Sequence, residues 1–160
     1  MKQIITLIAV LSFGVLSGQT TAIPDANFEQ ALIDLGYDTG TPDGSVPTAN
    51  IDTITELHIS SLAIADLTGI KDFTALTVLN CSYNVLTNLD VTQNISLTKL
   101  YCIDNQLTSL DVTQNISLTH LFCRENQLTS LDVSQNTVLT LLDCFTNQLS
   151  SLDISQNTAL

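Results

Sequence analysis

The sequence predicts an α/β repeat solenoid, a fold in which short similar units stack along one axis. Three observations lead to this prediction: a repeat of 21 residues, a cysteine that returns at the same place in each repeat, and an amphipathic segment before the first repeat. A fixed period of about 20 to 50 residues is typical of solenoids, because one unit cannot bury its apolar side chains alone. The four similar units span residues 76–96, 97–117, 118–138 and 139–159, and their cysteines are Cys81, Cys102, Cys123 and Cys144.

The N-terminal residues have the composition of a secretory signal peptide. A single charge, Lys2, precedes a short apolar run, and small and polar residues follow it. A membrane anchor would need about 18 or more unbroken apolar residues and a charged stop, and this run has neither. Cleavage could follow Gly18, Gln19 or Ala22, and the polar boundary does not decide among them. We predict a signal peptide over residues 1–22 and a secreted or outer-cell-surface location, without membrane insertion after cleavage.

The chain is strongly acidic, with 16 carboxylates and a formal net charge of -12. Beyond the leader, only Lys71, Lys99 and Arg124 carry a positive charge. Binding to phosphate backbones depends on many clustered cations, so nucleic acid is excluded as a partner and an anionic membrane surface is disfavoured. The acidity fits the solubility of an exported protein, and cation binding is the alternative.

Residues 23–53 are predicted to form an N-terminal helical cap and a loop. Residues 23–36 have the spacing of an amphipathic helix, and Gly36 can take the left-handed conformation that closes one. We expect this helix to cover the open core of the first repeat. Residues 37–50 lack periodicity and indicate a loop, whose aspartates fit turn chemistry because the ligand ladder of a calcium loop is missing. The apolar face of the helix comprises Phe28, Ala31, Leu32 and Leu35.

The repeat array is predicted over residues 54–160. It begins with a degenerate unit of 22 residues, in which Ile59 stands where later units have cysteine, and continues with four units of 21 residues. Leu160 begins a unit that the sequence does not contain, so the array is open at its C-terminal end. We therefore expect a fragment of a longer protein or end-to-end self-association through the uncapped last repeat. The apolar slots of the degenerate unit are Leu57, Ile59, Leu62, Ile64 and Leu67.

From Leu97 the unit reads LxxLxCxxNxL, which resembles the leucine-rich repeat signature L-x-x-L-x-L-x-x-N/C-x-L. The resemblance covers about residues 54–160. Together with the helical cap, the SLDVSQN return stretch and the cysteine slot, it looks like exported bacterial leucine-rich repeat proteins. The resemblance implies a curved right-handed coil with a parallel β-sheet on its concave side.

Side chains alternate along the strand segment, so Leu100 and Cys102 are expected to point inward and Tyr101 and Ile103 to point outward. An asparagine then turns the chain into the core in every unit. Its amide can satisfy loop backbone groups that would otherwise be buried without a partner. This structural ladder comprises Asn84, Asn105, Asn126 and Asn147.

The four cysteines are expected to pack in the core as small hydrophobic side chains. Equivalent residues on adjacent parallel strands lie about 4.8 Å apart with parallel side chains, whereas a disulfide needs Cβ atoms about 3.8 Å apart and a specific torsion. A linear stack also does not surround zinc tetrahedrally. Buried small hydrophobes are therefore favoured over strained disulfides or a metal site.

No catalytic residues and no cofactor are predicted. His120 lies near Cys123 in sequence, but alternation places the imidazole and the thiol on opposite sides of the sheet. The other histidine, His58, lies in the degenerate unit, and no nucleophile, base and acid set or phosphate loop appears. We therefore predict that the protein is not an enzyme.

An aspartate recurs in each return stretch and would form a column of like charges about 5 Å apart. We expect each carboxylate to accept backbone N–H groups of its own turn. Divalent cations between successive carboxylates are the weaker alternative. The column comprises Asp90, Asp111, Asp132 and Asp153.

The positions that differ between repeats are concentrated on the strand. They would form a concave surface of aromatic and aliphatic side chains with mixed charges, the composition of a protein-binding patch. The competing interpretation is drift at outward positions, with aromatics covering one another. We predict a recognition module that binds an extracellular protein, or a glycan, through this face; the alternative is a structural spacer in a larger exported multidomain protein. The predicted ligand-binding residues are Lys99, Tyr101, Ile103, His120, Phe122, Arg124, Asp143 and Phe145.

Overall fold

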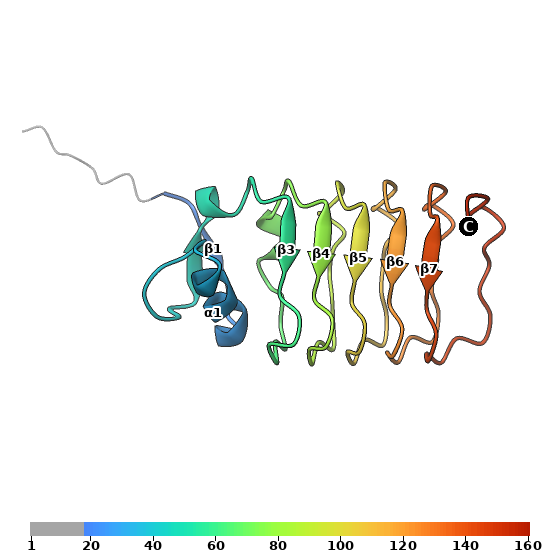
Figure 1. The fold of residues 1–160 in the computed structure, drawn as a ribbon, viewed down its shortest axis with the longest axis horizontal. Coiled ribbons are helices and arrows are strands. Elements are labelled where there is room, and N and C mark those ends of the chain that lie inside the picture. Colours follow the sequence, from blue (N-terminus) through green and yellow to red (C-terminus); the bar gives the residue numbers. More distant parts are fainter. Residues whose placement is uncertain (1–17) are drawn as a thin grey trace, which may run out of the picture.

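The computed structural model describes residues 18–160, so residues 1–17 of the predicted signal peptide lie outside the described part of the chain. The described residues form an elongated stack, with an N-terminal unit at one end and a five-stranded sheet along the rest (Figure 1). None of the helices in this part of the chain has the length and apolar character needed to cross a membrane. The N-terminal unit contains β1 (Thr20–Ala22), α1 (Ala26–Asp34) and β2 (Ser45–Pro47), and the sheet contains β3 (Glu56–His58), β4 (Val78–Asn80), β5 (Lys99–Tyr101), β6 (His120–Phe122) and β7 (Leu141–Asp143).

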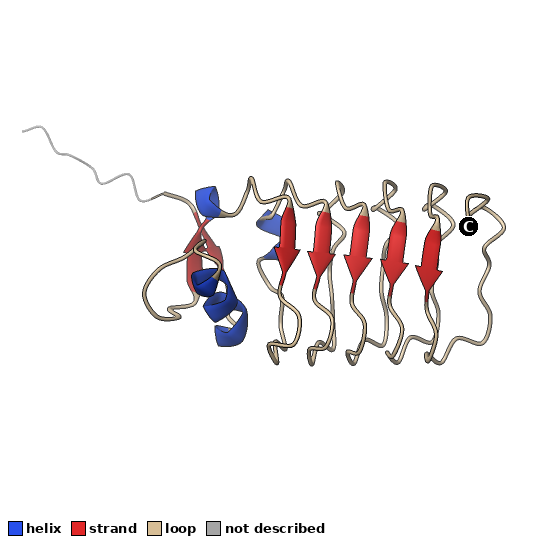
Figure 2. Ribbon diagram, in the orientation of Figure 1, coloured by secondary structure: helices blue, strands red, loops and turns tan. Residues whose placement is uncertain are grey.

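The five-stranded sheet is parallel throughout, and its strands follow one another in chain order (Figure 2). Equivalent residues lie opposite one another, so that Leu79 pairs with Leu100 and Leu100 with Leu121. The pairing continues past the strand ends, where the Cys81 N–H donates to the Tyr101 carbonyl at 2.8 Å. The repeat period therefore sets the register, and the predicted solenoid of parallel strands is confirmed.

One narrow core runs through all turns, between the sheet and the segments that carry the chain back. In the turn that begins at Leu97, Leu100 and Cys102 enter the core from the strand, while Leu107 and Leu110 enter from the opposite side. All of these side chains are buried, and their counterparts in the preceding and following turns pack against them. The core is thus built by repetition of a few positions, as the sequence predicts.

Two leucines lie outside the core positions predicted for them. Leu62 is 42% exposed at the turn after the strand, where later repeats bury an asparagine, and the backbone there differs, since both of its neighbours, Ser61 and Ala63, have positive φ. Leu35 is 45% exposed, because α1 ends at Asp34 and Leu35 forms the C-cap. The helix is therefore shorter than the predicted span of residues 23–36, and its buried face ends at Leu32.

Asp25 starts α1 and joins it to the first repeat. Its Oδ1 accepts the backbone N–H groups of Asn27 and Phe28 at 2.9 and 3.1 Å, which is the bonding of a helix N-cap. Its Oδ2 accepts the N–H groups of Ala65 and Asp66 at 2.7 and 3.0 Å. One carboxylate thus fixes where the helix begins and where it sits on the array.

The folded part of the chain begins earlier than the predicted start at Ile23. β1 starts at Thr20 and pairs antiparallel with β2, with Thr21 opposite Val46. Both of these side chains are buried. β2 itself lies in the segment predicted to be a loop, so the N-terminal unit is a small two-stranded sheet with one helix. Its first strand comes from residues that the sequence assigned to the leader.

Candidate functional site

One side of the sheet packs on the core, and the strands present outward side chains on the other side. We call this outward side the sheet face. The register places equivalent residues of adjacent strands opposite one another, so their side chains form columns. One column contains Val78, Lys99, His120 and Leu141, and the next contains Asn80, Tyr101, Phe122 and Asp143. Ile103, Arg124 and Phe145 follow two residues after these strands and are half-buried or exposed. The structure therefore brings the predicted ligand-binding residues together on one face.

An aromatic pair lies at the middle of the sheet face. The rings of Tyr101 and Phe122 stack with their centroids 5.0 Å apart and an interplanar angle of 7°. The imidazole of His120 lies 6.4 Å from the Phe122 ring, tilted by 33°. Its Nδ1 is 2.8 Å from the Thr119 hydroxyl, which holds the ring in place. The pair forms a half-buried aromatic platform with a polar neighbour.

Charged groups of both signs border this platform. Two of the four Lys and Arg residues in the sequence, Lys99 and Arg124, lie on the sheet face. Arg124 Nε is 3.6 Å from Asp143 Oδ2, and its Nη1 is 3.9 Å from Glu125 Oε1. These separations make ion pairs that are too long for hydrogen bonds. Arg124 Nε is buried and has no hydrogen-bond partner among the described residues.

Phe145 and Ser82 depart in opposite directions from the half-buried state of most sheet-face residues. Phe145 is 75% exposed on the last turn, so fewer neighbours cover it than cover Tyr101 and Phe122. Ser82, which holds the position of Ile103 in the preceding repeat, is buried, and its hydroxyl accepts the Ile103 N–H at 3.2 Å. Its small side chain therefore bonds to the next repeat and is not presented to solvent.

The residue that borders the sheet face in each repeat has an unusual backbone. Tyr83, Asp104, Glu125 and Thr146 all have positive φ, between 51° and 58°. This left-handed region is costly for residues with a Cβ, and most of all for a β-branched one such as Thr146. The sharp turn it produces sends the following asparagine into the core.

The asparagine that follows each of these turns holds successive turns together. The Asn105 amide donates to the carbonyls of Cys81, Cys102 and Ile103 at 3.1 to 3.3 Å, and its Oδ1 accepts the Leu86 N–H at 3.0 Å. Asn84, Asn126 and Asn147 make the equivalent contacts in their own repeats. Each amide therefore satisfies backbone groups of two turns at once.

A second asparagine column, which we did not single out from the sequence, lies on the opposite side of the core. Asn115 is fully buried, and its amide donates to the carbonyls of Val91 and Asn94 one turn back, at 3.0 and 2.9 Å. The equivalent residues Asn94, Asn136 and Asn157 bond in the same way. In the sequence, this asparagine is the last residue of the T/S-Q-N stretch that recurs in each repeat. The recurrence indicates that the position needs asparagine, but it does not indicate that the side chain is buried.

The four cysteines form a column of free thiols inside the core. Burial raises the pKa of Cys81 and of Cys123 to about 12, and it raises the pKa of Cys102 as well. Cys144, on the last turn, is half-buried, and its pKa is raised less by the same cause. A thiol must ionise to act as a nucleophile or a metal ligand, so these groups are suited to packing.

The aspartate column runs along the return side, by which we mean the segments 86–96, 107–117, 128–138 and 149–159. Asp111 Oδ1 accepts the backbone N–H and the hydroxyl of Thr113 at 2.9 and 2.7 Å, and these bonds hold its pKa below the usual value. Asp90 has the same contacts to Thr92, whose hydroxyl and N–H lower its pKa, with a smaller effect from Lys71. Asp132 and Asp153 accept from the second residue after them and have lowered pKa values for the same reason.

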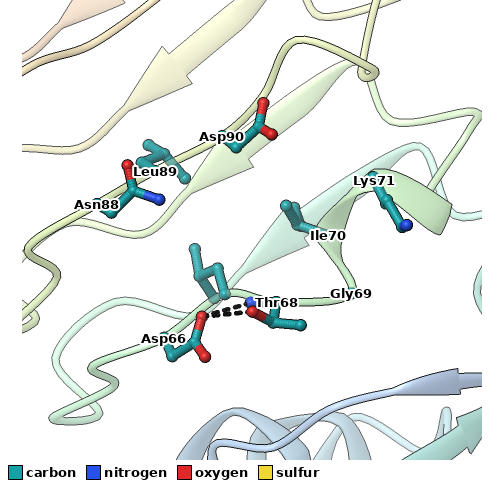
Figure 3. Close-up of a pocket in the computed structure, with 9 residues that line it drawn as sticks. Asp66, Thr68, Gly69, Ile70, Lys71, Asn88, Leu89 and Asp90 are labelled. Atoms are coloured by element: carbon teal, nitrogen blue, oxygen red, sulfur yellow. Dashed lines mark hydrogen bonds between the residues drawn. The ribbon is translucent and has the colours of Figure 1, made fainter.

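The hollows that the structure shows lie on the return side, away from the sheet face. One, of about 260 Å³, opens between the degenerate repeat and the next one, where Asp66, Thr68, Lys71 and Asp90 border it (Figure 3). Asp66 Oδ1 accepts the N–H and the hydroxyl of Thr68, both at 2.8 Å, so this carboxylate also serves its own turn. Across residues 18–160, no three His, Cys, Asp or Glu side chains come close enough to hold a metal ion together.

Comparison with known proteins places the chain among leucine-rich repeat proteins. It is 40% identical to internalin J of Listeria monocytogenes over 82 residues, which are 49% of this chain and 9% of internalin J. The solved functional domain of InlJ, described as including a cysteine ladder, superposes with a TM-score of 0.82 at 41% identity, over 89% of this chain and 32% of that one. An internalin (inlF) of the same species follows, with a TM-score of 0.74 and 25% identity over 87% of this chain and 42% of its own. No family model matches the sequence.

A third solved structure extends the likeness to another bacterium. A leucine-rich repeat protein of Leptospira interrogans superposes with a TM-score of 0.67 at 26% identity, over 69% of this chain and 31% of that one. The chain spans a small part of internalin J and about a third of the solved InlJ domain. With its parallel sheet, its 21-residue period and its asparagine and cysteine columns, the chain is a bacterial-type leucine-rich repeat protein whose homologues are internalins.

Proposed function

We propose that this protein is a secreted or cell-surface recognition module that binds an extracellular protein through the concave sheet face. An internalin-like leucine-rich repeat domain fits a protein-interaction module. The observation that carries the finer proposal is the stacked pair of Tyr101 and Phe122 at the middle of the face. Aromatic side chains at the centre of a face, bordered by charge, are the usual anchors of protein interfaces.

The shape of the face supports a macromolecular partner. Binding sites for small molecules are concave pockets that enclose most of the ligand. Both hollows that we describe lie on the return side, and residues such as Ser109 and Asp132 border the second one. The sheet face offers a broad row of half-buried side chains, which suits the large contact area of a protein partner.

The charges of the face support a partner that brings hydrogen-bond acceptors. Arg124 lies against Asp143 and Glu125 without a hydrogen bond to either carboxylate, and its side chain is 37% exposed although Nε is buried, so the terminal guanidinium nitrogens can donate to a partner. Lys99 lies one strand away from His120, beside the aromatic pair. The chain has a net charge of -12, so these two cations give the sheet face charges of both signs. Such charges orient a partner of complementary charge as it binds.

We propose also that α1 closes the N-terminal end of the core, and that the coil is right-handed and curved with the sheet on its concave side. The Phe28 ring stacks on Phe73 of the first repeat, with centroids 6.2 Å apart. A covered end keeps the first turn from exposing its apolar side chains, which terminal units of a repeat array require. The N-terminal unit thus supports the face without being part of it.

The experiment compares one variant on each side of the solenoid. Purified protein is applied to an array of extracellular proteins and, in parallel, to a glycan array, and the affinity for the strongest hits is measured. For Phe122→Ala we expect roughly a tenfold loss of affinity, as for an anchor residue at an interface centre. The matched control is Ile116→Ala, since Ile116 is 61% exposed on the return side, and its affinity should stay unchanged.

Three results would contradict the proposal in different ways. Equal affinity for the wild type and Phe122→Ala would remove the sheet face as the binding surface. Hits confined to the glycan array would replace the protein partner by a carbohydrate, which also stacks on aromatic rings. The absence of binding on both arrays would favour the structural spacer. Tyr101→Ala and Phe145→Ala extend the test along the face.

A further inference from the structure

The strand β1 joins the N-terminal residues to the rest of the fold. Its three residues pair with β2, and Thr21, which is 2% exposed, is the buried one. The Thr21 hydroxyl donates to Asp72 Oδ2 at 2.8 Å and lies 2.9 Å from the Thr48 hydroxyl. These contacts connect β1 to β2 and to the first repeat together, so the strand is an integral part of the N-terminal unit.

The first repeat is shaped to fit closely against this strand. Gly69 has φ of 101° and borders the hollow of Figure 3. A Cβ at this position would lie 2.6 Å from the Ala22 carbonyl oxygen and would also collide with the side chain of Ile23. Only glycine fits there while Ala22 and Ile23 are in place, which ties the turn of the first repeat to residues at the predicted leader boundary.

Each of the three candidate cleavage sites would place a charged amino group at a different point of this structure. A cut after Ala22 would place it at Ile23, which is 0% exposed and whose N–H donates to the Gly44 carbonyl at 2.9 Å. Burial of a charge in apolar surroundings is costly, and this cut would also remove β1. A cut after Gly18 would place the amino group at Gln19, which is exposed.

The requirement of the peptidase separates the two remaining sites. Leader peptidases need a small residue before the cut, which Gly18 supplies and Gln19 does not. A cut after Gln19 would also remove the carbonyl that accepts the Thr48 N–H at 2.9 Å. Gly18 is therefore the candidate that satisfies both the enzyme and the fold.

We propose that a leader peptidase cuts this protein between Gly18 and Gln19 and leaves β1 in the mature chain. This inference rests on the export that the proposed function includes. In the cut, water adds to the Gly18 carbonyl, the C–N bond breaks, and the leader leaves with a carboxylate while Gln19 gains an amino group. That exposed amino group can then attack its own side-chain amide carbon and expel ammonia, which closes a pyroglutamate ring.

The mature N-terminus tests the proposal directly. The full chain from Met1 is expressed in a bacterium with an outer membrane, and the exported protein is measured by intact mass and by sequencing of its N-terminal peptide. The expected product begins at Gln19, as free glutamine or as pyroglutamate. A product that begins at Thr20 or Ile23 overturns the cut while leaving export intact, and a product that keeps Met1 overturns both.

A pair of variants makes the test independent of folding. Gly18→Tyr places a large residue before the proposed cut, whereas Ala22→Tyr places it before the alternative one; both positions are exposed. We expect Gly18→Tyr to accumulate uncut precursor and Ala22→Tyr to be processed like the wild type. The reverse pattern would show that the peptidase cuts after Ala22, and processing of both variants would place the cut elsewhere.

Discussion

The sheet face and the return side are built from the same repeats but differ in how much their residues vary from one repeat to the next. On the return side, each repeat has nearly the same residues, and their polar groups bond within a turn or to the turn before, as Asp111 and Asn115 do. On the sheet face, the equivalent residues Asn80, Tyr101 and Phe122 differ in size and chemistry. The backbone pairing behind them is the same for every strand, so it places no demand on the outward side chain.

This difference shows where an array can change without losing its fold. A position whose side chain bonds to a neighbouring turn must keep that side chain in every repeat, because a lost bond leaves buried backbone groups without a partner. A position that faces solvent is free of this demand. The fold therefore permits the outward residues of the sheet face to vary. Two of these variable residues, Tyr101 and Phe122, stack on each other and form an ordered aromatic surface.

The largest loss of stability is expected in the asparagine ladder, whose side chains join neighbouring turns. In Asn105→Ala, the Leu86 N–H loses its partner inside the core, whereas the Cys81 carbonyl still accepts the Asn84 amide. An unpaired buried backbone group costs about 1 to 3 kcal/mol, so we expect the free energy of unfolding to fall by about 2 kcal/mol. Urea titration followed by circular dichroism measures it.

The neighbouring Gln106→Ala is the control for this prediction, because Gln106 is exposed and faces solvent. Its effect should stay within about 0.5 kcal/mol. If Asn105→Ala were as mild as this control, the asparagine ladder would not be what joins the turns, and backbone pairing alone would suffice.

The turn that borders the sheet face should respond in the opposite direction. Thr146 has φ of 52°, a conformation that is strained for a β-branched residue and open to glycine. We expect Thr146→Gly to raise the free energy of unfolding by about 1 kcal/mol, as the relief of strain exceeds the added freedom of the unfolded chain. Differential scanning calorimetry would show this as a higher melting temperature.

Thr108→Gly provides the matched control, since Thr108 is exposed and does not have a positive φ. It should lower the free energy of unfolding by about 0.5 to 1 kcal/mol, because glycine there only adds unfolded-state freedom. Equal effects of the two substitutions would mean that the left-handed turn is not strained at Thr146.

The sequence was sufficient for the features that depend on the period. A 21-residue repeat places identical letters side by side, which is why the columns of Cys102 and of Tyr101 follow from spacing and alternation alone. The asparagine slot follows from the signature, and its bonding from the need to satisfy backbone groups at a turn. None of this requires knowledge of where the surrounding atoms lie.

Features that depend on contacts between different segments did not follow from the period. Thr21 is buried only because β2 and Asp72 come to it from distant parts of the chain, so composition assigned it to the leader. Leu62 is apolar but exposed, in a turn whose backbone differs from that of the later repeats. The stacking of Tyr101 on Phe122 required the rotamers, which a sequence does not specify.

A smaller loss of stability is expected when one ring of the aromatic pair on the sheet face is removed. A stacked aromatic pair contributes about 0.5 to 1.5 kcal/mol beyond the burial of its area, and both rings are only half-buried. We expect Phe122→Ala to lower the free energy of unfolding by about 1 kcal/mol, clearly less than Asn105→Ala. A double-mutant cycle with Tyr101→Ala isolates the coupling of the rings. A coupling near zero would show that they share a surface without stabilising each other, and a loss as large as that of Asn105→Ala would remove the distinction between a structural side and a variable face.

The smallest effect belongs to the aspartate column and appears only in acid. The Thr113 N–H and hydroxyl hold the folded pKa of Asp111 below its ordinary value of 3.8, and Thr92 does the same for Asp90. Because the folded pKa values are lowered, this stabilisation is present above the ordinary value and is lost as the pH falls through the folded ones. The midpoint of urea unfolding should therefore fall on acidification, and Asp111→Asn should fall less, since an amide cannot take up the proton. Asp38→Asn is the control, because none of residues 18–160 donates a hydrogen bond to the Asp38 carboxylate. If both variants lost the same acid sensitivity, repulsion or general charge would govern the column in place of its own-turn hydrogen bonds.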